Sequence, residues 1–564
     1  CAMAGKLRLI ARFSGASENA NPELAMTENS KSENAAALRA WCLERMSLHK
    51  EAALSDPLAS GVRMLTIDIW DRLARGDIGR ADLSDLGKAI GDEALRARAM
   101  RLGGKAKAGD WRAVVDAAFS PLASRPFADI ANQLADTRAG VVFTAHPTFA
   151  LSRRMREAIG ALASGGEIQD SSQLRHAPDS SISLLAEHED VQGAIARAQA
   201  SMRALYAACF DWLRTHFPND WMKARPSLLS LATWVGYDLD GRTDIHWASS
   251  IRLRLEEKAL QLFRYAQSMS TLPGASALAE ELIEAGEEAA EQASRFAGDL
   301  DDPAAIVAAA NRLTEMRPGR ITSLNDIKRR MDALLETSDD ETRRALCIIR
   351  AEMDQYGLGV ARIHLRVNSA QIRSALRADL GFSPGREFLD RTALDAAAAK
   401  TAEARRKAIN FGSIFQEQMT ARRQLMLCAQ ILKHIDADTP LRFLIAEVEA
   451  PATIMGAIYL ARLYGVDRQL DISPLFETPD AIERGGRFVE RLLEEKEFLD
   501  YIRNRGRISI QCGFSDSGRF MGQIAADLAI DRLQILVSRA LAAKGVRDVE
   551  VVIFNTHGES MGRG

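Results

Sequence analysis

The sequence predicts an α/β protein with dominant helix content: a β/α barrel of the TIM type that carries large helical insertions and is incomplete at its carboxyl end. Two observations lead to this fold class. Seven short apolar, β-branched segments recur along the chain, separated by long stretches whose apolar residues follow three- and four-residue spacing. Nearly every short segment also turns polar or charged at its end, as barrel strands do where an active site forms.

The candidate strands are apolar along their length, which is typical of parallel strands covered by helices on both faces. They cover residues 140–148, 228–238, 359–368, 442–450, 470–477, 507–516 and 548–557. Strand-then-helix repeats form either a barrel or an open doubly wound sheet, and the polar strand ends favour the barrel. The eighth strand that a barrel needs would lie beyond Gly564.

The longer stretches are rich in Ala, Leu, Arg and Glu, which favour helices. Examples are residues 184–216, 247–269, 276–298 and 394–435. The acidic run ELIEAGEEAAEQ in one of them is expected to be a solvated helix face. The wide intervals 149–227 and 239–358 predict the helical insertions of the barrel.

The predicted organisation has three parts. Residues 1–35 are rich in Ala, Ser, Asn and Glu and are expected to be loosely ordered, and residues 36–139 form an N-terminal helical region. Residues 140–564 form the barrel with its insertions, truncated in the final catalytic loop. Because the chain begins with Cys1 and stops at Gly564 inside a glycine-containing loop, we expect a fragment with more chain on both sides.

The composition argues against several classes of protein. Acidic and basic residues nearly balance, at 76 and 73, unlike a protein that coats nucleic acid or an anionic membrane. The six cysteines form no CxxC pair or Cys/His cluster, so neither a zinc site nor a disulfide framework is indicated. The sequence has no apolar stretch of about 18 residues and no secretory h-region. We therefore expect a cytoplasmic protein with no nucleic-acid or membrane partner.

Six of the seven candidate strands end in an ionisable side chain. These residues are His146, Asp238, Arg366, Glu477, Asp516 and His557. In a β/α barrel they would converge at one mouth from distant positions in the chain. A purely structural strand can also end in a charge because loops are polar, but this mixture of His, Arg and carboxylate favours a site.

The residue types at these ends suit particular chemistry. Glu477 and Asp516 are natural ligands for Mg²⁺, which prefers one or two carboxylates plus water and substrate oxygens. His146 can carry a proton near neutral pH. Planar donors for a phosphate are available from Arg366, Arg519 and Arg563. Each signal alone is weak, because strand-end carboxylates more often cap helices and glycine-rich loops are often only turns.

The ordered set of motifs resembles that of phosphoenolpyruvate carboxylases, from Phe143 to Gly564. The motifs are TAHPT, GYDLDG, IHLR, SPLFET, GFSDSG and SMGRG, and LFET followed by GFSDSG after an early TAHPT is the most specific combination. The resemblance implies a lyase that carboxylates phosphoenolpyruvate with bicarbonate, giving oxaloacetate and phosphate. It also implies Mg²⁺ or Mn²⁺ as the cofactor and a homotetramer.

The resemblance also assigns roles to residues. It implies that His146 is the catalytic acid/base and that Glu477 and Asp516 bind the metal. Bicarbonate would attack the phosphorus, giving carboxyphosphate and an enolate, and the enolate would then attack released carbon dioxide. The residues assigned to catalysis and to the substrate are Arg366, Arg519, His557, Ser560 and Arg563, the last also associated with feedback by aspartate.

The sequence departs from the family pattern at several positions. Phe149 stands where a glutamate is usual, and Arg519 replaces a lysine. Most serious is the last loop, where His557 stands in place of an arginine and Asn555 in place of a histidine. A histidine is neutral much of the time at pH 7 and offers no bidentate fork.

The departures leave a second interpretation open. The chain could be a catalytically impaired, carboxylase-like protein that acts as a metabolite-binding or oligomerisation module. A third interpretation, a helical scaffold without any site, is disfavoured because a scaffold has no need of a carboxylate pair and a histidine at strand ends.

Overall fold

The computed structural model describes most of the chain. The described residues are 35–56, 60–105, 110–143, 151–167, 174, 179, 182–240, 242, 244–298, 302–317, 319–381 and 390–555, without the side chains of residues 105, 378, 514–516, 519 and 555. The chain divides into two compact units, unit 1 with residues 1–107 and 151–177, and unit 2 with residues 108–150 and 178–564. The boundaries expected from the sequence stay a prediction.

Unit 1 is helical. Its described elements are α2 (Ala35–Ser55), α3 (Gly61–Ala74), α4 (Arg80–Lys105) and α7 (Arg153–Ala163). Helix α3 begins where Ser60 accepts a hydrogen bond from the N–H of Arg63, a standard N-cap. Two small clusters of buried apolar residues hold the helices together, one around Leu38 and one around Met155.

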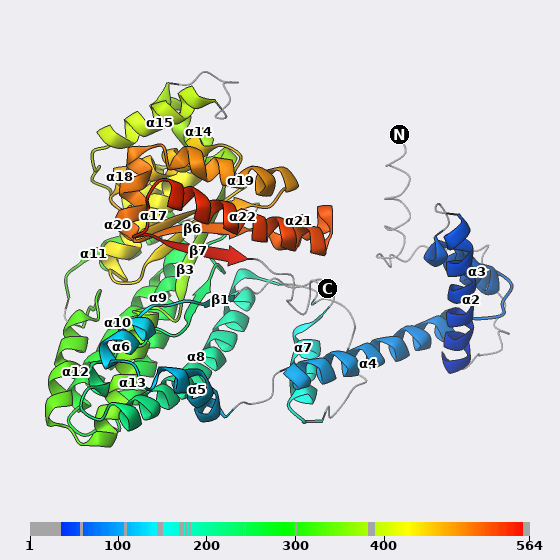
Figure 1. Ribbon diagram of the computed structural model, residues 1–564, viewed down its shortest axis with the longest axis horizontal. Coiled ribbons are helices and arrows are strands. Elements are labelled where there is room, and N and C mark those ends of the chain that lie inside the picture. The colour runs from blue at the N-terminus through cyan, green and yellow to red at the C-terminus, as the bar shows by residue number, and fades with distance from the viewer. Residues whose placement is uncertain are drawn as a thin grey trace. The chain divides into compact units, whose positions relative to one another are not determined.

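The centre of unit 2 is a curled sheet of seven parallel strands in chain order, which forms a half-barrel (Figure 1). The strands are β1 (Gly140–Phe143), β2 (Ser230–Thr233), β3 (Arg362–Asn368), β4 (Leu441–Ala446), β5 (Leu470–Phe476), β6 (Arg507–Cys512) and β7 (Glu550–Asn555). Each overlaps one predicted strand. The predicted fold, an incomplete β/α barrel, is confirmed.

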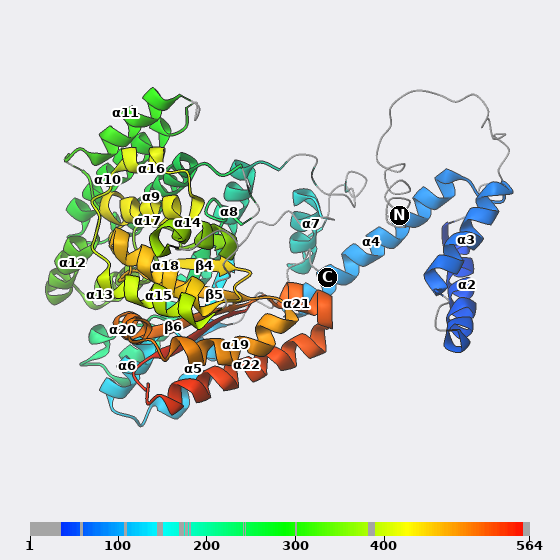
Figure 2. The ribbon, with the colours of Figure 1, turned by 90° about the horizontal axis from the view of Figure 1, so that it is seen from above.

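Helices follow the strands and cover the outer face of the sheet (Figure 2). The helices that follow β3 in the chain are α14 (Ser369–Leu380), α15 (Arg391–Glu403), α16 (Phe411–Gln416), α17 (Thr420–His434), α18 (Pro451–Tyr464), α19 (Pro479–Leu492), α20 (Lys496–Arg505), α21 (Phe514–Met521) and α22 (Gln523–Ala543).

The predicted insertions are helical as well. They and the preceding segment contain α5 (Trp111–Phe119), α6 (Phe127–Ala135), α8 (Leu184–His216), α9 (Trp247–Met269), α10 (Ser276–Arg295), α11 (Pro303–Thr314), α12 (Asn325–Thr337), α13 (Asp340–Tyr356) and the short 3₁₀ turns η1 (Ser120–Leu122) and η3 (Trp221–Lys223). Helices α8 and α9 match the predicted ranges. The helical stretch 394–435 is divided among α15, α16 and α17, and Asn410 starts α16 with a capping box.

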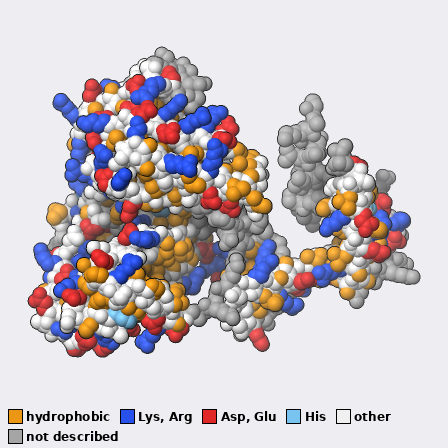
Figure 3. All heavy atoms as spheres, in the orientation of Figure 1, with side chains coloured by type: hydrophobic (Ala, Val, Ile, Leu, Met, Phe, Trp, Pro, Cys, Tyr) orange, Lys and Arg blue, Asp and Glu red, His pale blue; other side chains and the backbone are white. Residues whose placement is uncertain are grey.

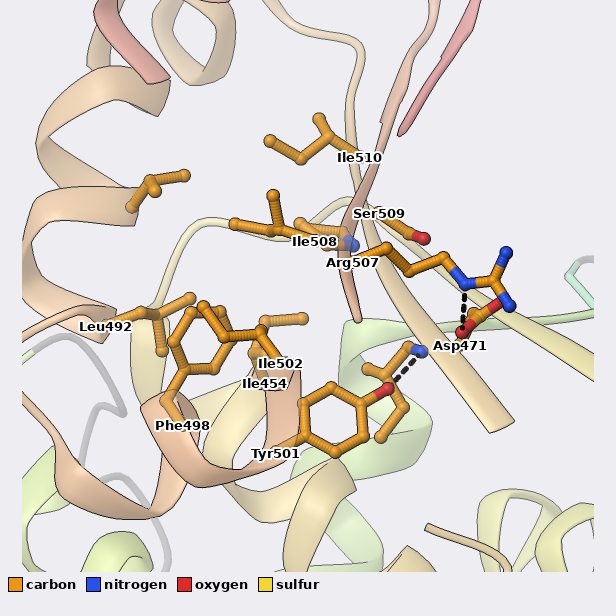
Figure 4. A pocket seen from close by; sticks show the side chains of 13 residues that line it. Ile454, Asp471, Leu492, Phe498, Tyr501, Ile502, Arg507, Ile508, Ser509 and Ile510 are labelled. Carbon is orange, nitrogen blue, oxygen red and sulfur yellow. Dashed lines mark hydrogen bonds and ion pairs between the residues drawn. The ribbon is translucent and has the colours of Figure 1, made fainter. Parts of the chain in front are cut away.

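The strands are less uniformly apolar than the sequence analysis assumed. Successive side chains of a strand point to opposite faces. Figure 4 shows this for β6, where Ile508 and Ile510 lie toward the helices and Arg507 and Ser509 point to the other side. The outer-face residues belong to the largest hydrophobic cluster, whereas several inner-face positions are polar. The enclosed space between β5, β6 and the helices is only about 10 Å³, room for one water at most.

The surface of the described residues carries both signs of charge. Figure 3 shows Lys and Arg side chains interspersed with Asp and Glu over the helices that cover the sheet. No helix among the described ranges combines the length and the hydropathy that crossing a bilayer requires.

Candidate active site at the carboxyl end of the sheet

The segment after β2 is held against the end of β3 by backbone hydrogen bonds. The N–H of Arg366 donates to the carbonyl of Tyr237 at 3.1 Å, and the N–H of Leu239 donates to the carbonyl of Arg366 at 2.9 Å. Asp238 and Arg366 therefore form a parallel bridge beyond the end of β2. This register brings the two acids of the DLD sequence beside the arginine at the end of β3.

Arg366 is paired with both acids. Its Nη2 donates to Asp240 Oδ2 at 2.7 Å, and its Nη1 lies 3.8 Å from Asp238 Oδ2. Asn368 adds a 3.4 Å hydrogen bond from Nδ2 to the other oxygen of Asp240. The guanidinium is largely buried, so the pairs are shielded from solvent.

Burial also acts on the acid. It raises the pKa of Asp238 because desolvation disfavours the carboxylate, and the positive charge of Arg366 opposes that rise. The Nε of Arg366 is buried and has no hydrogen-bond partner among the described residues. The predicted role of Arg366 in phosphate binding stays a prediction, and the structure adds that two carboxylates already engage this side chain.

Glu477 lies directly after β5 and is fixed from the neighbouring strand. Its Oε1 accepts a hydrogen bond from the backbone N–H of Glu447 at 3.1 Å. Glu447 follows β4 with a φ of 54°, in the left-handed region, and it is the only described residue other than glycine with a positive φ. Such a conformation costs about 1 kcal/mol or more and is found chiefly where the surroundings enforce it.

Gly513 brings the next strand close to Glu477. Its N–H donates to the carbonyl of Phe476 at 2.8 Å, which extends the β5–β6 pairing by one residue. A Cβ at position 513 would come within 2.5 Å of the Glu477 Cβ, so only glycine allows this approach. Helix α21 starts immediately afterwards, and its first turn contains Asp516.

Most of the other predicted site residues cannot be placed. His146, His557, Ser560 and Arg563 lie outside the described residues, and only the backbones of Asp516 and Arg519 are described. The structure thus brings Arg366 together with Asp238 and Asp240, and Glu477 together with Gly513 and Glu447, along one edge of the sheet. The meeting of the complete set stays a prediction.

Glu447 is a site residue that the sequence pattern did not reveal. The strand predicted at 442–450 was the one to which no charged end was assigned, although Glu447 and Glu449 occur in it. The charges were visible, but the φ of Glu447 and its hydrogen bond to a residue 30 positions away were not. Asp240 was noted in the sequence, but its pairing with Arg366 was not foreseen.

A hollow of about 580 Å³ adjoins this edge, between the starts of α18 and α19. It is open to solvent, and its charged lining consists of three arginines of α19 and two acids; these residues are Arg484, Arg487, Arg491, Glu449 and Asp480. The hollow also borders Val448 and Glu449, the two residues that follow Glu447.

A divalent cation would find oxygen ligands here. Among the described residues, no group of three or more His, Cys, Asp and Glu side chains clusters as a metal site. Mg²⁺ needs only one or two carboxylates, because water and substrate oxygens complete its shell. Glu477 and Asp516 therefore suit the ion by donor chemistry, and the Gly513 contact places their backbone segments side by side.

The comparisons with known proteins agree on one family. A sequence model described as phosphoenolpyruvate carboxylase matches residues 322–564. A phosphoenolpyruvate carboxylase of Xanthomonas oryzae pv. oryzae is 27% identical over 377 residues, covering 60% of this chain and 40% of the relative. A phosphoenolpyruvate carboxylase of Thermus thermophilus is 24% identical over 451 residues, covering 75% and 51% respectively. The chain thus spans about half the length, or less, of these curated relatives.

Proposed function

This chain belongs to the phosphoenolpyruvate carboxylase family, and from that premise we propose that it forms the catalytic half-barrel of a carboxylase. The reaction would join bicarbonate-derived carbon to phosphoenolpyruvate and give oxaloacetate and phosphate. In a cytoplasmic setting this activity would supply the tricarboxylic acid cycle, and the enzyme would work as a homo-oligomer, a tetramer by family precedent.

The observation that carries this proposal is the arrangement around Glu477. An unfavourable φ at Glu447 and a glycine at position 513 are both required to fix one carboxylate at the end of β5. Strained backbone of this kind concentrates at functional sites, where the geometry serves a ligand. A structural glutamate at the start of a helix would need neither feature.

Glu477 and Asp516 would hold Mg²⁺ or Mn²⁺. When bound, the ion would act as a Lewis acid toward substrate oxygens that gain negative charge. The role of the chain is to hold the first carboxylate still, through the N–H of Glu447, before any ligand arrives. A preorganised ligand loses less conformational freedom on binding.

The remaining roles are those that the family resemblance implies. His146 would move the proton, and the arginines would spread the phosphate charge. The arginines in question are Arg366, Arg519 and Arg563, with Ser560 and His557 in the same loop as the last. The Nη2 of Arg366 already donates to Asp240, so a phosphate would compete with this acid for the guanidinium.

A second candidate function rests on that same pairing. If Arg366 stays with Asp240, the phosphate would lose one donor in a site whose last loop already carries His557 instead of an arginine. The chain would then bind a metabolite, or support an oligomer, without turnover. The paired state of Arg366 is the observation that favours this alternative.

A coupled assay tests the proposal. Oxaloacetate formation by the purified protein is followed with phosphoenolpyruvate, bicarbonate and Mg²⁺, and phosphoenolpyruvate binding is measured separately by calorimetry. We expect turnover, and we expect Glu477→Gln to reduce it by about a thousandfold because a carboxylate ligand is lost. Glu490→Gln, on the exposed part of α19, is the matched control and should behave as the wild type.

The two candidates predict different results in this assay. Binding of phosphoenolpyruvate without turnover would favour the metabolite-binding module. Turnover that survives Glu477→Gln would refute the assignment of Glu477 to the metal.

A further inference from the structure

The amino ends of the strands enclose a second cavity, on the side of the sheet opposite to the candidate active site. Its volume is about 430 Å³, and residues of β1 to β7 line it. The lining includes the first residues of several strands, such as Gly140, Ser230 and Glu550. None of the residues assigned to metal, substrate or catalysis at the carboxyl end lines this cavity.

Three arginines enter the cavity from three strands. Arg362 begins β3, Arg442 is the second residue of β4, and Arg507 begins β6. Asp471 of β5 lies beside Arg442 in the strand register. Because side chains alternate along a strand, Arg362 shares the inner face with His364, which lines the same cavity.

Asp471 is already shared between two cations. Its Oδ1 accepts a hydrogen bond from Arg505 Nε at 2.7 Å and lies 3.3 Å from Arg507 Nε. Figure 4 shows the side chains of Arg507 and Asp471 meeting on the inner side of β6. Arg362 and Arg442, in contrast, have no ion-pair or hydrogen-bond partner among the described residues.

Buried polar atoms in the cavity wall are also left without partners. Within the described ranges, neither Arg362 Nε nor His364 Nδ1 has a hydrogen bond, and the His364 side chain is 5% exposed. Buried polar groups nearly always form hydrogen bonds in folded proteins, so an unpaired atom is expected to bind a ligand or a water. Burial and the neighbouring arginines lower the pKa of Arg362 to about 10 and also lower that of Arg442.

The other described acids in the cavity, Asp136 and Glu550, form no ion pair with Arg362 or Arg442. Asp136 and Glu550 lie on its β1 and β7 side, where burial, together with a hydrogen bond between the two acids, raises the pKa of Glu550. Asp136 is also paired with Arg138 at 3.1 Å. Both acids are thus engaged on the β1 and β7 side of the cavity, with each other and, for Asp136, with Arg138.

We propose that Arg362, Arg442 and Arg507 bind a compact oxyanion, a phosphate or a small carboxylate, in this amino-end cavity. Guanidinium groups offer planar pairs of donors that match such anions. An anion would supply partners to Arg362 and to His364 and would relieve the repulsion among the three arginines. The cavity is far larger than a phosphate, so a ligand that carries the group on a longer body also fits.

Titration of the purified protein tests this proposal. Inorganic phosphate, malonate and chloride are added at equal ionic strength, and binding is followed by calorimetry and by the midpoint of thermal unfolding. The measurements use the Arg366→Gln background, so that phosphate bound at the carboxyl end is weakened and does not mask the second site. Phosphate and malonate separate the two sources of an oxyanion, and chloride reports a general salt effect.

We expect saturable binding of phosphate or malonate that weakens at least tenfold in Arg442→Gln and Arg362→Gln. Arg503→Gln is the matched control, because Arg503 lies on α20 and its ion pair is with the exposed Asp548. Arg362→Lys should bind with intermediate affinity, since it keeps the charge and loses the planar fork.

Three results would overturn the proposal. These are no saturable binding, equal stabilisation by chloride, and equal affinity in Arg442→Gln and the control. The variants remove a repulsive, partly buried charge and should fold, which circular dichroism verifies. Since the readout is binding in the Arg366→Gln background, the result is independent of whether the protein turns over phosphoenolpyruvate.

Discussion

The two ends of the half-barrel are built on the same strands, but they differ in how their charged side chains are paired. At the carboxyl end, Arg366 is paired with two acids, and Glu477 is held by a backbone N–H. At the amino end, Arg362 and Arg442 have no partner among the described residues, and one acid, Asp471, serves two other arginines. The acids that pair with Arg366 stand in the segment after β2, whereas the three arginines of the amino-end cavity and Asp471 stand on strands.

The loops at the carboxyl end have irregular backbone. The segment after β2 continues parallel to β3, and Glu447 adopts a left-handed conformation. Such loops can place a partner next to each charge. The amino-end charges instead stand on the strands, where the register places Arg442 between His364 and Asp471. One end is therefore preorganised, and the other is electrostatically unsatisfied until an anion arrives.

The largest effect is expected from Asp471→Asn, which removes the acid that Arg505 and Arg507 share. Removing one partner of a buried ion pair leaves an uncompensated charge, so the free energy of unfolding should fall by about 3 kcal/mol. Urea unfolding measures it. Phosphate should restore part of the loss if it binds the guanidinium groups that have lost this acid.

Asp548→Asn is the control for that experiment. Asp548 contacts Arg503 at 3.6 Å on the surface, and exposed pairs contribute less than about 1 kcal/mol. If both variants lost the same free energy of unfolding, the ion pairs of Asp471 would be no more stabilising than an ordinary surface pair.

Gly513→Ala should disturb the carboxyl end through packing alone. The new Cβ would meet the Glu477 side chain at 2.5 Å, and the shift it forces should cost about 1–3 kcal/mol of stability. Metal-dependent binding of phosphoenolpyruvate should weaken about tenfold, as calorimetry would show. Gly193→Ala is the control, because a Cβ there would meet only the Arg197 guanidinium at 3.6 Å. Unaltered binding in Gly513→Ala would mean that the position of Glu477 does not matter.

Asp240→Asn tests whether Asp240 competes with a phosphate for Arg366. The change removes the acid that holds the guanidinium at 2.7 Å, so a phosphate no longer has to displace it. We expect the affinity for phosphoenolpyruvate to rise a few-fold, measured by calorimetry. A fall in affinity would instead mean that Asp240 positions Arg366 for the substrate.

The smallest effect concerns the pH dependence of stability. Burial raises the pKa of Asp238 in the folded protein, so the folded state keeps a proton that the unfolded chain has lost. The stabilising contribution is present below the ordinary pKa of an aspartate and is lost as the pH rises through the raised value. Asp238→Asn should remove this loss. Urea unfolding at pH 4 and at pH 7 would show a gain for the variant that grows with pH, by about 1 kcal/mol at most.

The amino-acid pattern was enough to predict the seven strands, their parallel order, the barrel class and the ranges of α8 and α9. These features depend on local periodicity and on the alternation of strand and helix, which are written in neighbouring residues. The polar inner face of the strands could also have been predicted, since RIHLR and RISIQ alternate polar and apolar residues. Because these segments were interpreted as continuous apolar runs, the polar inner face of the sheet was overlooked.

Which charged side chains contact one another depends on the folded arrangement of the strands and loops. The pairing of Arg366 with Asp240 spans 126 positions, and that of the buried Arg254 with Asp436 spans 182. The φ of Glu447 and the lack of a described partner for Arg442 depend on neighbouring strands in the same way. Pairing across strands is set by register and loop geometry over distances that no local pattern records, and for that reason the chemistry of both ends became visible only in the folded chain.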